Sequence, residues 1–108
     1  MVYEMRTYTI PNNFRSVFNA RFETVVVDLL KKHGIQLIGA WDYYTGELQN
    51  FMYIVAYKDL ADKEKQWAAF NADPDWKAAK AKTLQEHGQI ISRNESTILK
   101  PAAFSPLQ

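Results

Sequence analysis

The sequence contains no cysteine and only two histidines. The missing cysteines exclude disulfide bonds, thiol catalysis and zinc or iron–sulfur centres built on cysteine. Two imidazoles are too few for an all-histidine metal site. Glycine-rich phosphate loops, Gly-x-Ser-x-Gly elbows and His-Glu-x-x-His motifs are also missing. We therefore expect no metal and no required cofactor, and no nicotinamide, ATP or serine-hydrolase chemistry.

Neither positive nor negative charge predominates in the sequence, and the sequence has no long apolar run. Thirteen Lys and Arg against twelve Asp and Glu leave a net charge of +1, which argues against a nucleic-acid partner. Apolar runs such as residues 25–27 are far shorter than a membrane span. No targeting segment precedes the first β-rich residues, so we expect a cytoplasmic protein without a membrane partner. The lysines predicted to form a solvated face are Lys63, Lys65, Lys77, Lys80 and Lys82.

The 108 residues, 47% of them hydrophobic, are predicted to fold as one domain over residues 1–108, with a tail from about residue 100. Valine, tyrosine, threonine and isoleucine over residues 2–10 predict a strand. Helical apolar spacing predicts one helix over residues 14–33, ended by Gly34. Further strands are predicted over residues 35–44, 48–58 and 89–99, with Thr45-Gly46-Glu47 as the turn of a hairpin. Asp59 and Asp73 are predicted to cap two more helices, and His87-Gly88 to end the second.

This β-α-β-β-α-β order predicts an α+β, ferredoxin-like fold with a four-stranded antiparallel sheet in the order 4-1-3-2. Helices on one side leave the other face of such a sheet bare. Aromatic and β-branched residues occupy both parities of the second and third strands, so that face is not typical of a solvated surface. We expect a homodimer in which two sheets pack face to face.

Several motifs, in this order, resemble one family. They are Tyr3-Glu4-Met5-Arg6-Thr7-Tyr8-Thr9, His33-Gly34, Gly39-Ala40-Trp41, Asp73-Pro74-Asp75-Trp76, Leu99-Lys100-Pro101 and Phe104-Ser105-Pro106-Leu107. Together they span nearly the whole chain and are similar to those of NIPSNAP domains. The resemblance implies a dimeric α/β barrel with a pocket between sheet and helices. Relatives in this wider superfamily include cofactor-independent monooxygenases, haem-degrading enzymes and stress-response proteins, and fold kinship alone assigns no chemistry.

Glu4, Arg6 and Tyr8 are spaced by two and so share one face of a central strand. Arg93 and Glu95 share a face of the neighbouring fourth strand, and we expect the two groups to meet. One interpretation is a buried ion-pair network at the dimer interface. The other is a pocket in which Arg6 anchors a carboxylate or phenolate and Tyr8 donates a proton.

Aromatic residues and histidines have two interpretations each. Trp41, Tyr43, Tyr53 and Tyr57 have similar parities, which suits either a core or a site for a flat ligand. The aromatic residues of the later helices, Trp67, Phe70 and Trp76, either face the core or roof a pocket. His33 and His87 either stabilise helix ends or act as a haem ligand or general base.

The sequence favours a protein that binds a small, flat organic molecule, with cofactor-independent oxidation as the reaction considered. The candidate catalytic residues are Arg6, Tyr8 and Tyr53. The candidate ligand-binding residues are Glu4, His33, Trp41, Tyr43, Trp67, Arg93 and Glu95. Two alternatives stay open: a non-catalytic interaction or scaffold dimer, and a haem-handling protein.

Overall fold

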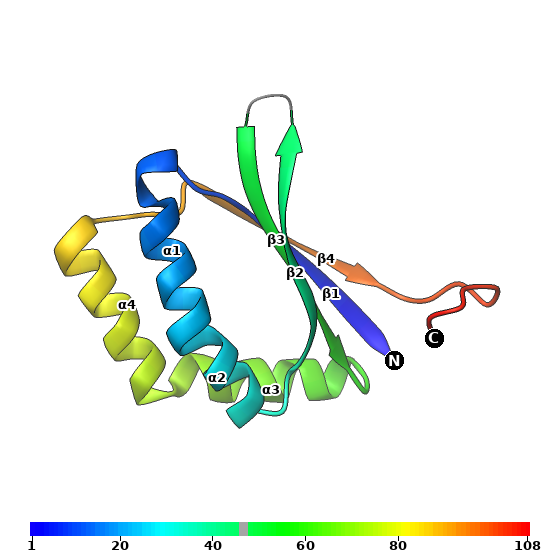
Figure 1. Cartoon of the computed structure of the whole chain (residues 1–108). Helices are drawn as coiled ribbons and strands as arrows, with labels where there is room; N and C mark the ends of the chain where they lie inside the picture. The colour runs from blue at the N-terminus through cyan, green and yellow to red at the C-terminus, as the bar shows by residue number, and fades with distance from the viewer. Residues whose placement is uncertain (46–47) are drawn as a thin grey trace.

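A computed structural model of the chain describes residues 1–45 and 48–108 (Figure 1). The predicted hairpin turn includes Gly46 and Glu47, which lie outside the described residues. The elements follow in the order β1 (Val2–Thr9), η1 (Asn12–Phe14), α1 (Arg15–Arg21), η2 (Phe22–Val26), α2 (Val27–Lys32), β2 (Gln36–Thr45), β3 (Leu48–Tyr57), α3 (Leu60–Ala72), α4 (Pro74–His87) and β4 (Arg93–Leu99).

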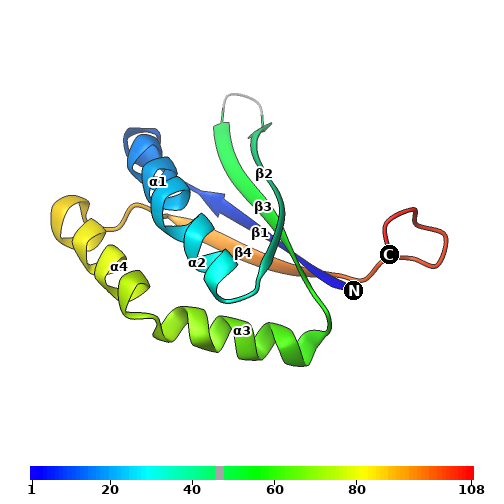
Figure 2. The same ribbon diagram turned by 60° about the horizontal axis from the view of Figure 1, so that its bottom comes forward.

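The four strands form one antiparallel sheet in the order β2-β3-β1-β4. This is the predicted order, and the α+β ferredoxin-like fold is confirmed. All the helices lie on one side of the sheet: α1 and α2 run across it, α3 also contacts β3, and α4 lies farther out (Figures 1 and 2). The last strand begins at Arg93 and not at residue 89, because the pairing with β1 ends where Thr9 faces Arg93. Ile90, before it, packs into the core and is only 3% exposed.

The predicted helix ends are confirmed at atomic level. The Asp59 carboxylate accepts a hydrogen bond from the Asp62 amide at 2.8 Å, and Asp73 accepts one from the Asp75 amide at 2.8 Å. Pro74 stands at the first turn of α4. Gly88 ends that helix with a φ of 74°, a value that residues with a Cβ rarely adopt.

The first helix differs from the prediction of one regular helix over residues 14–33. It consists of a 3₁₀ turn, an α-helical segment, a π-helical turn over Phe22–Val26 and a second α-helical segment. A π turn inserts an extra residue into the helical ladder, which displaces the apolar stripe that follows it. Single-sequence spacing does not resolve such an insertion, because the apolar period before and after it stays helical.

The two faces of the sheet are distinguished by strand register. Glu4 pairs with Val55, Arg6 with Tyr53 and Tyr8 with Phe51, so these side chains share the face that the helices cover. On β2, Trp41 pairs with Met52 and Tyr43 with Asn50. The expectation that Trp41 and Tyr43 share a face with Tyr53 and Tyr57 is therefore wrong. A β-bulge between Leu37 and Gly39 shifts the register, and after it odd-numbered residues of β2 lie beside even-numbered residues of β3.

We call the side of the sheet away from the helices the open face. It includes Trp41, Tyr43, Met52, Ile54, Thr7, Thr9, Arg93 and Glu95. The indole of Trp41 is 46% exposed and lies on Gly39, where a Cβ would come within 2.7 Å of the ring. Near one end of this face the Tyr3 hydroxyl donates to the Gln108 carbonyl at 2.8 Å. Over the described part of the chain, every helix is too short or too polar to cross a membrane.

Candidate functional site

A cavity of about 260 Å³ lies between the helix-covered face of the sheet and the helices, and we call it the inner pocket. Its lining comes from β1, β3 and β4 below and from α1, the π turn, α3 and α4 above. The lining residues are Arg6, Tyr8, Phe18, Arg21, Phe22, Val26, Tyr53, Trp67, Phe70, Asn71, Trp76, Lys80, Ile91 and Asn94. Half of these residues are aromatic, and the charged side chains among them are all cationic.

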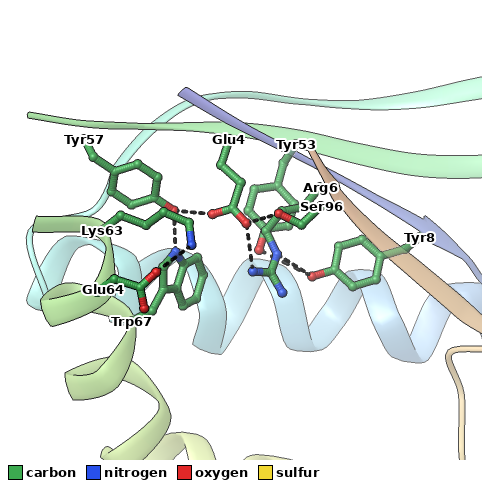
Figure 3. Close-up of polar contacts among 9 residues, drawn as sticks. All are labelled: Glu4, Arg6, Tyr8, Tyr53, Tyr57, Lys63, Glu64, Trp67 and Ser96. Carbon is green, nitrogen blue, oxygen red and sulfur yellow. Dashed lines mark hydrogen bonds and ion pairs between the residues drawn. The ribbon is translucent and has the colours of Figure 1, made fainter. Parts of the chain in front are cut away.

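Arg6 projects into the inner pocket from the centre of the sheet (Figure 3). Its Nε donates to the Tyr8 hydroxyl at 3.1 Å, and its Nη1 lies 3.4 Å from the Glu4 carboxylate. Its guanidinium stacks over the Trp67 ring at 4.7 Å from the ring centroid. Among the described contacts, its Nη2 has no hydrogen-bond partner. The group therefore has a donor left for an acid that enters the pocket.

Burial by itself would lower the pKa of Arg6. Tyr53 and Tyr8 act against that effect, together with the Glu4 carboxylate, and the net result is a pKa above the usual value. Arg6 is therefore a permanent cation. A ligand with a negative group can accept a charge-assisted hydrogen bond from Arg6. This bond persists because the guanidinium does not lose its proton.

Glu4 lies directly behind Arg6 and is only 2% exposed. Its Oε1 accepts from the Tyr57 hydroxyl at 2.6 Å, and its Oε2 accepts from Ser96 and lies near Arg6 (Figure 3). Burial raises the pKa of Glu4, but the hydrogen bonds from Ser96 and Tyr57 and the charge of Arg6 outweigh it and leave the pKa lowered. Glu4 is therefore ionised, and both of its oxygens already accept hydrogen bonds. It holds Arg6 in place and does not line the pocket.

Tyr8 and Tyr53 bring two hydroxyls to the same spot. Their oxygens are 3.4 Å apart, and their rings are stacked at 5.9 Å between centroids. Tyr8 is 9% exposed and Tyr53 is 3% exposed. Burial and the proximity of Tyr8 raise the pKa of Tyr53 well above 10. Tyr53 is therefore a neutral hydroxyl that can donate a hydrogen bond or relay a proton, and it is not a base at neutral pH.

Four predicted site residues line the inner pocket together: Arg6, Tyr8, Tyr53 and Trp67. Glu4 supports them from behind. Glu4 and Arg6 do form an ion pair, at 3.4 Å, but it lies under the helices and not on the sheet face that the predicted dimer would bury.

The predicted meeting of Glu4 and Arg6 with Arg93 and Glu95 is also wrong. Thr7 pairs with Glu95 and Thr9 with Arg93, which places both charged residues of β4 on the open face. There they bond to each other and line a shallow hollow of about 190 Å³ with Tyr43. Spacing by two showed that each pair shares a face, but the register between strands decides which face.

His33 lies outside the pocket lining, at the end of α2. Its Nε2 is 2.8 Å from the Asp73 carboxylate, which also contacts Lys32 at 2.8 Å. Hydrogen bonds from Lys32 and His33 hold the pKa of Asp73 well below its usual range. This contact ties the end of α2 to the cap of α4. His87 lies near Phe14, 6.5 Å between ring centroids, with Glu86 at 3.7 Å.

Sequence analysis did not select Arg21, Lys80, Asn71 or Asn94 for the site, although all four line the pocket. A signal for Arg21 exists, because it follows Phe18 by three residues and precedes Val25 by four, on the edge of the apolar stripe. Lys80 gives a similar signal, since it follows Trp76 by four residues and precedes Leu84 by four on α4. Among the described residues no group of three or more His, Asp or Glu side chains could hold a metal ion.

Solved structures similar to this one include two from the same family. A NIPSNAP family protein of unknown function from Agrobacterium tumefaciens has 30% sequence identity and a TM-score of 0.84, over 100% of this chain and 94% of that one. An uncharacterized NIPSNAP domain protein from Burkholderia xenovorans has 28% identity and a TM-score of 0.83, over 98% and 99% of the two chains.

A more distant likeness concerns the fold alone. An antibiotic biosynthesis monooxygenase has 8% identity and a TM-score of 0.59, over 94% of this chain and 99% of that one. No curated protein matches the sequence significantly. The family model of NIPSNAP matches residues 3–106, which is nearly the whole chain. With the fold and the similar structures described above, this match shows that the chain belongs to the NIPSNAP family.

Proposed function

We propose that this protein binds a small, flat organic molecule with an acidic group in the inner pocket. The observation that carries the proposal is the position of Arg6. Its guanidinium lies in a cavity walled by aromatic rings, stacked on Trp67, with Nη2 unpaired among the described contacts. A carboxylate or phenolate that enters the pocket can accept a charge-assisted hydrogen bond from this Nη2.

The shape and polarity of the pocket support the same class of ligand. A volume of about 260 Å³ suits a molecule with one ring or two fused rings and not a nucleotide or a peptide. The rings of Phe22 and Tyr53, 5.1 Å apart, offer an apolar wall opposite Trp67 and Phe70. Since the charged groups of the lining are cations, an anionic ligand is favoured over a neutral or cationic one.

Binding is tested by isothermal titration calorimetry with naphthoate and, as a matched neutral probe, naphthalenemethanol. We expect saturable binding of naphthoate at one site per chain and binding of the alcohol at least tenfold weaker, since Arg6 distinguishes the charges. Absence of heat with naphthoate at millimolar concentration, or equal affinity for both probes, contradicts the proposal.

Cofactor-independent oxidation is a second candidate function, and the Tyr8–Tyr53 hydroxyl pair next to Arg6 favours it. In this scheme Arg6 holds a phenolate, which is electron-rich enough to react with dioxygen, and Tyr8 or Tyr53 relays a proton. The measurement is oxygen uptake matched to loss of a phenolic substrate in protein free of added metal and flavin. If a bound phenol gives no oxygen uptake, the oxidation is refuted and the proposed function is reduced to binding.

We further propose that the open face packs against a second copy of the chain. Trp41 is 46% exposed there, and its strand partner Met52 and Ile54, the partner of Gly39, lie beside it. Exposed aromatic and aliphatic side chains on a sheet of this size are typical of an interface. Both copies present the same open face, and the helices already cover the other side of each sheet. The open face is therefore the one that remains for packing against the second copy.

A lysine in place of Ile54 should convert a dimer into a monomer, because it would place an unpaired charge between the two sheets. Light scattering coupled to gel filtration should give twice the chain mass of 12.5 kDa for the wild type and 12.5 kDa for Ile54→Lys. Leu60→Lys, at an exposed leucine on α3, is the matched control and should stay dimeric. A monomeric wild type would refute this assembly.

A further inference from the structure

Three aromatic rings form a row along α3 and α4, above the inner pocket. Trp67 and Phe70 are 4.9 Å apart between ring centroids, and Phe70 and Trp76 are 5.3 Å apart. Each outer ring carries cations. Arg6 stacks on Trp67 at 4.7 Å, while Arg21 and Lys80 lie over Trp76 at 5.1 and 5.6 Å. The pocket therefore has positive charge at both ends of an apolar row.

The second cationic end lies at the boundary between the inner pocket and an outer groove of about 520 Å³. Arg21, Lys80, Ile91 and Asn94 line both spaces. The groove continues along α4 and the segment before β4, past Thr83 and Gln89. A ligand that reaches from Arg6 past Phe70 would meet Arg21 and Lys80 where the pocket opens.

Neither Arg21 nor Lys80 has an ion-pair partner among the described residues. Arg21 belongs to the last turn of α1, immediately before the π turn, and Lys80 comes from α4. Burial lowers the pKa of Arg21, an effect that no nearby carboxylate reverses. Arginine remains protonated nonetheless, so its charge is partly desolvated and without a counter-ion. Two cations over one ring repel each other, and an anion bound between them would offset this repulsion.

We propose that the ligand of this protein carries two acidic groups at opposite ends of a flat apolar body. One group binds Arg6, and the other binds Arg21 and Lys80. The inference rests on the proposed function and makes it more specific, because it changes the ligand class from aromatic acids in general to dianions of about two fused rings. A monoanion held by Arg6 leaves the second cationic end without a partner, which lowers its affinity relative to the dianion.

The test compares naphthoate with a naphthalene dicarboxylate that has its acids at opposite ends, by calorimetry at low salt. The wild type should bind the dicarboxylate at least tenfold more tightly than naphthoate. The double variant Arg21→Met/Lys80→Met should remove that advantage, because it should weaken binding of the dicarboxylate at least tenfold more than binding of naphthoate. Lys77→Met, one turn away on α4 and exposed, is the matched control and should leave both affinities unchanged.

The possible outcomes separate this inference from the proposed function. If the two probes bind equally well to the wild type, or if the double variant weakens both by the same factor, the second anionic site is refuted and the binding pocket stands. If neither probe binds, the proposed function itself fails. Retention of naphthoate binding in the double variant also shows that the variant is folded, so a loss of dicarboxylate affinity reports the removed charges.

Discussion

Replacing Arg6 by methionine should weaken naphthoate binding by about 10- to 100-fold. The substitution keeps an unbranched side chain of similar length and removes the guanidinium donors and their charge. A hydrogen bond to a charged group contributes about 1.5–3 kcal/mol, which corresponds to that loss. Calorimetry with the purified protein gives the ratio of dissociation constants directly.

Two controls distinguish a lost anion contact from a damaged pocket. Affinity for neutral naphthalenemethanol should stay within a factor of about two in Arg6→Met, because the aromatic walls are unchanged. Arg6→Lys should lose less than Arg6→Met, since it keeps the charge but not the fork of donors. An equal loss for the acid and the alcohol would mean that Arg6 shapes the pocket and does not hold an acid.

Replacing Glu4 by glutamine should lower the free energy of unfolding by about 1–3 kcal/mol. The carboxylate is buried, accepts from Tyr57 and Ser96, and faces the Arg6 guanidinium. An amide keeps the shape but loses the charge and one acceptor. Urea unfolding followed by circular dichroism measures the change. Glu95→Gln, at an exposed carboxylate on the same sheet, is the matched control and should change stability by less than about 0.5 kcal/mol.

The destabilisation in Glu4→Gln should also depend on pH. The pKa of Glu4 is lowered in the folded protein, so the unfolded chain binds more protons near the ordinary value of 4.5. The stability contributed by the carboxylate is therefore complete above that pH and is lost as the pH falls through the lower, folded value. The difference between wild type and variant should shrink below about pH 4.5. A difference that stays constant from pH 7 to pH 3 would show that Glu4 is not an ionised partner of Arg6.

Much of the fold followed from local rules. Strand and helix order, the caps at Asp59 and Asp73 and the glycine ends are consequences of backbone geometry within a few residues. Helix and strand order in turn restricts the sheet to few topologies. Period-two spacing also showed correctly that Glu4, Arg6 and Tyr8 share one face.

Tertiary structure decided which face each group occupies and which groups meet. Alternation along a strand is symmetric between its two sides, so only register and the position of the helices place Arg6 under Trp67 and Trp41 on the open face. In the same way, tertiary packing brings Arg21 of α1 to the Trp76 ring, where Lys80 already lies one turn further along α4. The sequence by itself determined the elements and their order, because these depend on neighbouring residues. The pocket and its charges arise from contacts between distant residues, which only packing in three dimensions specifies.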